Sequence, residues 1–183
     1  MPQPAPPVPQ VPAGWHPVQA DFDLWVTDSF SFLAQPANLR VQLTAAQSLT
    51  GGVFNVQHFD ATAIEDPYGG WSATATGGQP AYSWLCPPAC GGWYEATLTA
   101  QCASQGSGTT NQLVATIALN GALWQYGSDD WAVASAPSGS NGPVAVPMLP
   151  GDYVQMWVFS TQSASTPTTA GELPAMELNW VSF

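Results

Sequence analysis

Apolar and polar side chains alternate through much of this sequence, and the alternation is clearest between Trp93 and Cys102. A period of two is that of a β-strand with one face buried and the other in water. One face would carry Tyr94, Ala96, Leu98, Ala100 and Cys102, and the other Glu95, Thr97, Thr99 and Gln101. The segment therefore predicts a β-strand with one face in the core and the other in water. Cys102 is expected to be a buried free thiol.

Turn signals separate further segments of this kind. Asn120-Gly121, the preferred pair of a two-residue hairpin turn, follows the alternating segment 113–119 and predicts a return strand. Residues 150–152 predict a tight turn, and residues 138–143 are expected to form a Gly/Ser/Asn loop. Other strands are expected at Leu39–Leu43, Val53–Phe59, Val144–Leu149, Tyr153–Ser160 and Met176–Phe183. About eight short strands without helices between them predict an all-β antiparallel sandwich or jelly roll.

The first 36 residues differ from the rest. Residues 1–17 contain seven prolines, which favour an extended arm. In residues 18–36, apolar side chains recur at helical spacing and predict one short helix, followed by Phe30 and Phe32. So short a segment cannot bury this aromatic surface alone, so we expect it to pack against its own domain or a neighbouring subunit. Residues 37–183 would form the head domain.

The charge balance excludes several classes of function. Twelve acidic residues stand against a single cation, Arg40, and the net charge is −11. Such a chain cannot neutralise a row of phosphates, so nucleic-acid binding is excluded. No run of about 18 apolar residues is present, so we expect no membrane insertion. The N-terminal residues also lack the features of a secretory signal, which favours a particle assembled in the cytoplasm and released by lysis.

No arrangement of catalytic residues stands out in the sequence. The doublets Glu65-Asp66 and Asp129-Asp130 would point to opposite faces of a strand, whereas a glycosidase needs two carboxylates that face each other across a cleft. Calcium binding by loop acids is a weaker alternative. We therefore expect no enzyme, no metal site and no cofactor.

Cysteines and tryptophans leave alternatives open. Cys86-Pro-Pro-Ala-Cys90 could close a small disulfide loop outside the reducing cytoplasm, or hold two free thiols in a turn. Several of the nine tryptophans fall in or beside expected loops, where an indole can stack on a sugar ring. The alternative is that they fill the core and subunit interfaces. The candidates for glycan contact are Trp71, Trp124 and Trp131.

The expected strand Tyr153–Ser160 is apolar on both faces. Val154, Met156 and Val158 lie on one face, and Tyr153, Gln155, Trp157 and Phe159 on the other. A strand of this kind needs cover on both sides, from another sheet or another chain.

Several motifs resemble small virion proteins of tailed bacteriophages that are often called minor tail proteins. The likeness begins with Thr44–Leu49, Val53–Asp60, Glu65-Asp66 and Gly69–Trp71. The later motifs are also shared with tumour-necrosis-factor-like and complement-like globular heads: Gly92–Glu95, Asn120-Gly121, Leu149–Val154 and Leu178–Val181. The resemblance covers residues 39–183, and residues 15–33 look like the leader of such phage proteins. The Cys86–Cys90 loop departs from the pattern.

The resemblance implies a homotrimeric jelly roll on the outside of a phage particle, assembled in the host cytoplasm and extracellular after lysis. Its partners would be itself, other tail or capsid proteins and, in host attachment, a cell-surface glycan. Tail association is favoured, a capsid decoration protein is the alternative, and a glycan-acting enzyme is a distant third. In such heads one sheet faces the three-fold axis, so the candidate trimer interface is Tyr153, Gln155, Trp157 and Phe159. The candidates for anchoring the head to the virion are Trp15, Phe22, Trp25, Phe30 and Phe32.

Overall fold

The computed structural model describes residues 36–88, 90–102, 110–133, 138–166 and 174–182; the side chains of residues 110, 126–133 and 138–141 are not described. The expected arm, the helix and the five candidate anchor residues lie outside these ranges. The strands are β1 (Asn38–Gln42), β2 (Ser48–Leu49), β3 (Phe54–Val56), β4 (Trp71–Ser72), β5 (Ser83–Leu85), β6 (Gly92–Gln101), β7 (Thr110–Leu119), β8 (Ala122–Val133), β9 (Ser138–Met148), β10 (Tyr153–Ser160), β11 (Ala164–Ser165) and β12 (Ala175–Ser182).

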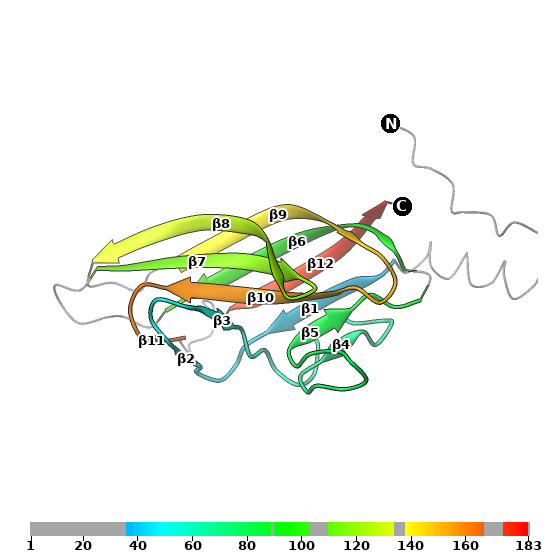
Figure 1. The fold of residues 1–183 in the computed structure, drawn as a ribbon, viewed down its shortest axis with the longest axis horizontal. Helices are drawn as coiled ribbons and strands as arrows, with labels where there is room; N and C mark the ends of the chain where they lie inside the picture. The colour runs from blue at the N-terminus through cyan, green and yellow to red at the C-terminus, as the bar shows by residue number, and fades with distance from the viewer. Residues whose placement is uncertain (1–35, 89, 103–109, 134–137, 167–173, 183) are drawn as a thin grey trace, which may run out of the picture.

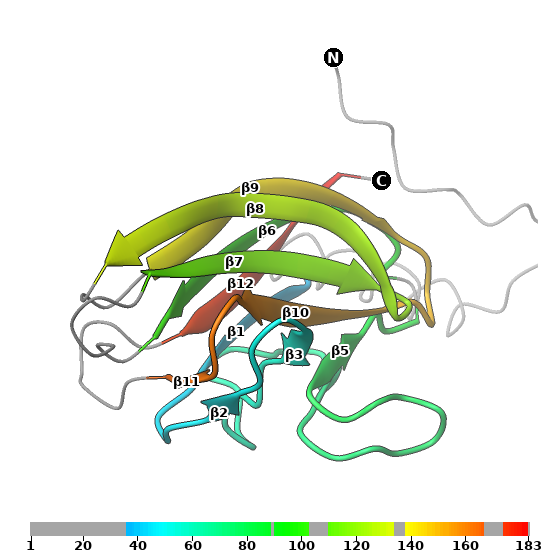
Figure 2. The same ribbon diagram turned by 60° about the vertical axis from the view of Figure 1, so that its left-hand side comes forward.

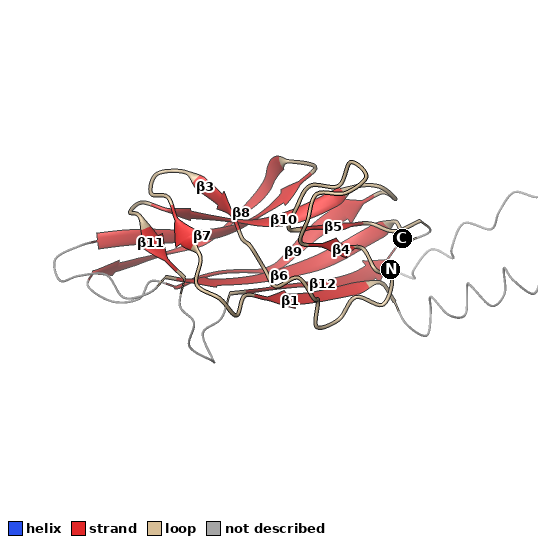
Figure 3. Cartoon of the chain, turned by 90° about the horizontal axis from the view of Figure 1, so that it is seen from below, coloured by secondary structure: helices blue, strands red, loops and turns tan. Residues whose placement is uncertain are grey.

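Two antiparallel sheets pack face to face (Figures 1 and 2). One has the strand order β1-β12-β6-β9, and the other the order β4-β5-β10-β7-β8, with β3 also paired to β10. β2 and β11 form a separate two-stranded ribbon. The described residues contain strands and loops without helices (Figure 3), which confirms the expected all-β jelly-roll sandwich. In this part of the chain, no helix is long and apolar enough to cross a membrane.

The core lies between the two sheets and follows the alternation of the sequence. In β6 and at the residue directly after it, the five expected residues from Tyr94 to Cys102 are buried and the residues between them face outward, as predicted. β10 contributes Val154, Met156 and Val158 from the opposite sheet. Burying one face of each sheet against the other removes apolar surface from water, and this is the main favourable term in folding.

Both predicted turns are present. Asn120 and Gly121 have φ angles of 52° and 76°, which are those of the type I′ turn that matches the twist of a hairpin. The Asn120 side chain also ties the turn to the start of β10, because its Oδ1 accepts a hydrogen bond from the Tyr153 backbone N–H at 2.9 Å. In the second turn, Gly151 has a φ of 92° and the Asp152 N–H donates to the Leu149 carbonyl at 2.9 Å.

Some expected boundaries were wrong. Residues 138–143 are the first half of β9 rather than a loop, because the long strand β6 offers hydrogen-bonding groups that pair with them as far as Ser138↔Gln101. Pairing thus overrides the weak strand preference of Gly, Ser and Asn. The strand expected at Val53–Phe59 is limited to β3. The strands β2, β4, β5 and β11 were not expected, since two or three residues are too few to show a period.

Candidate binding surfaces

The outer face of β10 is a half-buried aromatic surface. Val154, Met156 and Val158 point into the core, so the intervening side chains of Tyr153, Gln155, Trp157 and Phe159 lie on the other face of the six-stranded sheet. Tyr153, Trp157 and Phe159 remain partly exposed, whereas Gln155 is buried. The structure therefore places the four candidate interface residues on one face of one strand.

Other parts of the same chain cover this face in part. The Phe54 ring lies 6.3 Å from the ring of Trp157 and 5.3 Å from that of Phe159, between ring centroids. Gln155 is held by two hydrogen bonds: its Nε2 donates to the Ala81 carbonyl at 2.8 Å, and its Oε1 accepts from Trp157 Nε1 at 3.2 Å. The Gln155 amide and the Trp157 indole N–H are therefore paired within the chain, and the partly exposed side chains of this face are aromatic.

The neighbouring strand β7 continues this face with Val114, Thr116 and Ala118, which are already buried within the chain. Val114 lies opposite Phe159 and Ala118 lies opposite Gln155, and directly opposed residues share a face of the sheet. The sequence analysis missed both residues and also Phe54. The alternation of β7 singled out only its inward residues, and a ring contact between β3 and β10 leaves no local signal in the sequence.

The three candidate glycan-contacting tryptophans lie in strands rather than in loops. Trp71 is half-buried in β4, where its Nε1 donates to the Asp60 carbonyl at 3.1 Å. Trp124 of β8 is 44% exposed, and its Nε1 donates to the Ala145 carbonyl of β9 at 2.9 Å. Trp131 is also in β8, opposite Gln112, and its side chain is not described. β4 and β8 are at opposite edges of the six-stranded sheet, so Trp71 and Trp124 do not form one site.

The Glu65-Asp66 doublet has two separate structural roles. Asp66 accepts hydrogen bonds from the backbone N–H groups of Gly70 (3.1 Å) and Trp71 (2.7 Å) and from Trp84 Nε1 (3.1 Å). Glu65 instead accepts from Asn38 Nδ2 at 3.4 Å. Neither carboxylate faces the other across a cleft. The side chains of Asp129 and Asp130 are not described.

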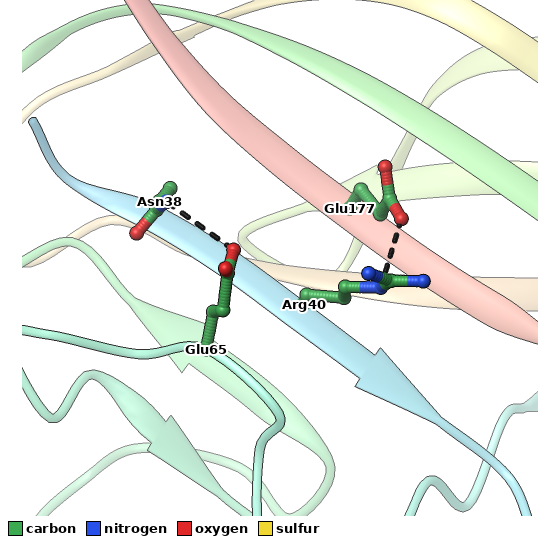
Figure 4. A network of polar contacts seen from close by, with 4 residues as sticks. All are labelled: Asn38, Arg40, Glu65 and Glu177. Atoms are coloured by element: carbon green, nitrogen blue, oxygen red, sulfur yellow. Dashed lines mark hydrogen bonds and ion pairs between the residues drawn. The ribbon is translucent and has the colours of Figure 1, made fainter.

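Arg40 and Glu177 form an ion pair on the outer face of the four-stranded sheet, with 3.1 Å between Nε and Oε1 (Figure 4). Both side chains are largely exposed, so the pair contributes about 1 kcal/mol or less. Among the described residues, no group of three His, Cys, Asp or Glu side chains is placed to hold a metal ion.

Cys86, Cys90 and Cys102 are buried free thiols. Cys86 and Cys90 are therefore not bonded to each other in this structure. Cys86 Sγ lies 3.4 Å from the Cys90 carbonyl oxygen, which also accepts a hydrogen bond from the Tyr94 hydroxyl. Burial raises the pKa of Cys86 and of Cys102 to about 11. The burial of Cys102 as a free thiol confirms the expectation from the alternation.

Comparison with known proteins identifies the fold. No protein-family model matches the sequence, and no curated protein matches it. The globular domain of the zebrafish complement 1qA protein superposes with a TM-score of 0.52 at 15% identity, over 80% of this chain and 98% of that one. Murine APRIL superposes with a TM-score of 0.51 at 9% identity, over 78% and 98% of the two chains. The chain therefore has a jelly-roll fold like those of C1q globular domains and tumour-necrosis-factor-family proteins.

Proposed function

We propose that this chain is a non-enzymatic, homotrimeric jelly-roll module on the surface of a tailed-bacteriophage virion. In this proposal it is assembled in the host cytoplasm and becomes extracellular on lysis. It is associated with the tail and contributes to binding of the host surface.

The observation that carries the proposal is the outer face of β10. Three aromatic side chains of this face, Tyr153, Trp157 and Phe159, are only partly covered by their own chain. Interface cores are enriched in aromatic residues and depleted of charge, and the outer residues of β10 have both properties. The buried amide of Gln155 is already hydrogen-bonded within the chain, so a second copy could cover the face without leaving that amide unpaired.

The virion assignment is supported by the motif likeness to phage tail proteins and by composition. A head domain with a single cation, a Pro-rich arm and an aromatic leader suits a module fixed at one end to a larger particle.

Of the two virion locations, a tail module would be present in a few to a few tens of copies per particle. A capsid decoration protein would be present in hundreds. Quantitative mass spectrometry of purified particles separates the two.

Light scattering tests the trimer. The purified chain should have a mass of about three times 19.2 kDa at micromolar concentration. Replacing Trp157 and Phe159 by Ser should give monomers that keep their β-sheet circular dichroism. Ile64→Ser is the matched control, because Ile64 is a large exposed apolar residue away from β10 and its loss should leave the mass unchanged. A wild-type monomer would refute the trimer.

Adsorption assays test host binding. Trp124→Ala particles should adsorb to host cells more weakly, because an indole stacked on a sugar contributes about 1 kcal/mol per site and three sites act together. Ile64→Ala is the control, since Ile64 is a similarly exposed apolar residue (50%) outside the candidate sites. Trp71 and Trp131 are tested in the same way. Unchanged adsorption in all three variants, with hundreds of copies per particle, would favour the decoration alternative.

Deleting residues 1–33 tests the anchor. The remaining head should stay soluble and folded but should no longer be incorporated into particles, because the aromatic anchors Trp15, Phe22, Trp25, Phe30 and Phe32 are lost. If incorporation persists, attachment lies in the β domain.

A further inference from the structure

Exposed apolar side chains gather at one end of the four-stranded sheet. Among the residues with described side chains, six large apolar ones are exposed, and three of them are Trp93 (45%), Leu149 (72%) and Val181 (46%). Trp93 of β6 lies opposite Pro147 of β9, and the exposed Leu149 directly follows the end of β9. Val181 lies at the register shift beside Ser182, the partner of Trp93. We call Trp93, Pro147, Leu149 and Val181 the end stripe.

Close packing holds the segments that carry the stripe together. A Cβ on Gly92 would collide with the Ser182 carbonyl, and one on Gly91 would lie 2.9 Å from the Pro150 ring. The start of β6, the end of β12 and the turn after β9 are therefore a rigid support. A rigid, exposed apolar stripe is a surface on which an aromatic segment can dock at little cost in ordering the protein.

The described chain begins at this same end. The Ala37 carbonyl accepts a hydrogen bond from the Trp180 N–H at 3.1 Å, just before β1. Figure 1 shows the start of β1, the end of β12 and the turn between β9 and β10 at one end of the sandwich. Residues 1–35 therefore reach the head beside the end stripe.

We propose that residues 18–33 of the same chain dock on the end stripe through their aromatic side chains. Leu33 is four residues from Ala37, a reach of at most about 14 Å. β6 is two strands away from β1, a distance of about 10 Å. Phe30, Phe32 and Leu33 are thus tethered within reach of Trp93. Such a short tether gives an effective concentration in the millimolar range, above that of a second copy at micromolar concentration.

This inference does not depend on the virion assignment. In the proposed virion, the docked segment would keep its anchor aromatics out of water until the particle supplies a competing surface. The virion assignment could fail while docking holds, because docking is measured on the free protein.

Hydrogen exchange of the full chain, followed by mass spectrometry, tests the docking. Amides of residues 18–33 should exchange at least tenfold more slowly in the protein than in a synthetic peptide of residues 14–35. In the triple variant Trp93→Ser/Leu149→Ser/Val181→Ser they should exchange at the peptide rate, while β7 and β10 stay protected. The control Val53→Ser/Ile64→Ser removes two exposed apolar residues outside the stripe and should keep the protection. Absence of protection in the wild type, or protection that the triple variant retains, would overturn the proposal.

A second arm of the experiment distinguishes docking within one chain from docking on a neighbouring copy. The exchange is repeated at 1 and 100 µM protein and in the Trp157→Ser/Phe159→Ser variant, with the mass of each sample measured by light scattering. Protection that persists in a sample shown to be monomeric supports docking within the chain. Protection that appears only in oligomeric samples would refute it and assign the stripe to contacts between copies.

Discussion

Individual indoles in this fold are held by specific acceptors. Trp124 is an example: it extends from β8, the last strand of one sheet, and its N–H reaches Ala145 of β9, the last strand of the other. Unpaired edge strands invite pairing with other chains, and a bulky side chain across the edge blocks this. Trp124 thus links the two edge strands β8 and β9 across one side of the sandwich.

Trp124→Phe should lower the free energy of unfolding by about 0.5 to 1 kcal/mol, because it removes one hydrogen bond to a partly hydrated carbonyl and keeps most of the ring. Urea unfolding followed by circular dichroism measures the change. Trp93→Phe, at a site of equal exposure, should change stability less. Equal effects of the two substitutions would contradict the edge role.

The buried thiols predict a loss of stability at high pH. The folded protein keeps the protons of Cys86 and Cys102 up to a pKa of about 11, whereas their ordinary value is 9.0. Between these values unfolding releases protons, so the free energy of unfolding is undiminished below pH 9 and falls as the pH rises toward 11. Two pKa units correspond to at most about 3 kcal/mol for each thiol.

Urea unfolding at pH 8, 9, 10 and 10.5 measures this slope. Cys102→Ala should be less stable at pH 8 because of the lost sulfur, but its stability should fall less steeply with pH. A slope identical to that of the wild type would show that Cys102 does not titrate as proposed.

At the scale of elements, one loop determines how β4 and β5 sit on the sandwich. The Asp66 carboxylate accepts hydrogen bonds from the backbone N–H groups of Gly70 and Trp71 and from the indole N–H of the fully buried Trp84. A Cβ at Gly70 would collide with the Leu85 carbonyl and the Trp84 ring, so only glycine fits there. The loop therefore closes tightly over the buried indole.

Asp66→Ala should destabilise the protein by about 3 kcal/mol, because it leaves a buried indole N–H and two backbone N–H groups without their acceptor. Glu65→Ala is the matched control, since the neighbouring carboxylate accepts a single exposed hydrogen bond, and it should cost about 0.5 kcal/mol or less. Thermal and urea unfolding give both values. Similar losses in the two variants would argue against this account of the loop.

At the scale of the whole molecule, charge opposes assembly. Each chain carries a net charge of −11, and its single cation, Arg40, is already paired with Glu177. Three such chains repel one another, and this repulsion is screened by salt because the Debye length falls from about 20 Å to about 6 Å as salt rises from 20 to 300 mM.

The dissociation constant of the proposed trimer should therefore fall about threefold or more over this salt range, as a result of that screening. Sedimentation equilibrium measures it. Sucrose at equal osmolality is the control, because it does not screen charge. Assembly that weakens with salt would show that attractive ion pairs dominate the interface.

Much of the fold could be predicted from local sequence pattern. The alternation of residues 93–102 identified the buried residues of β6 and the buried Cys102 that follows it, because a period of two is imposed on any strand with one face in the core. The turns at Asn120-Gly121 and Gly151 could also be predicted, because their positive φ angles favour particular residues. The all-β class and the antiparallel sandwich follow from these local signals together.

The candidate surfaces were decided by tertiary structure. Phe54 meets Phe159, and Trp124 meets Ala145, only because strands distant in the chain are placed side by side. The same placement made a strand of residues 138–143 and put Trp71 and Trp124 at opposite edges of one sheet. The sequence by itself thus determined which residues turn inward, since burial acts through a local period. Which outward residues meet on a surface depends on strand order and register, and these are settled only when the whole chain packs.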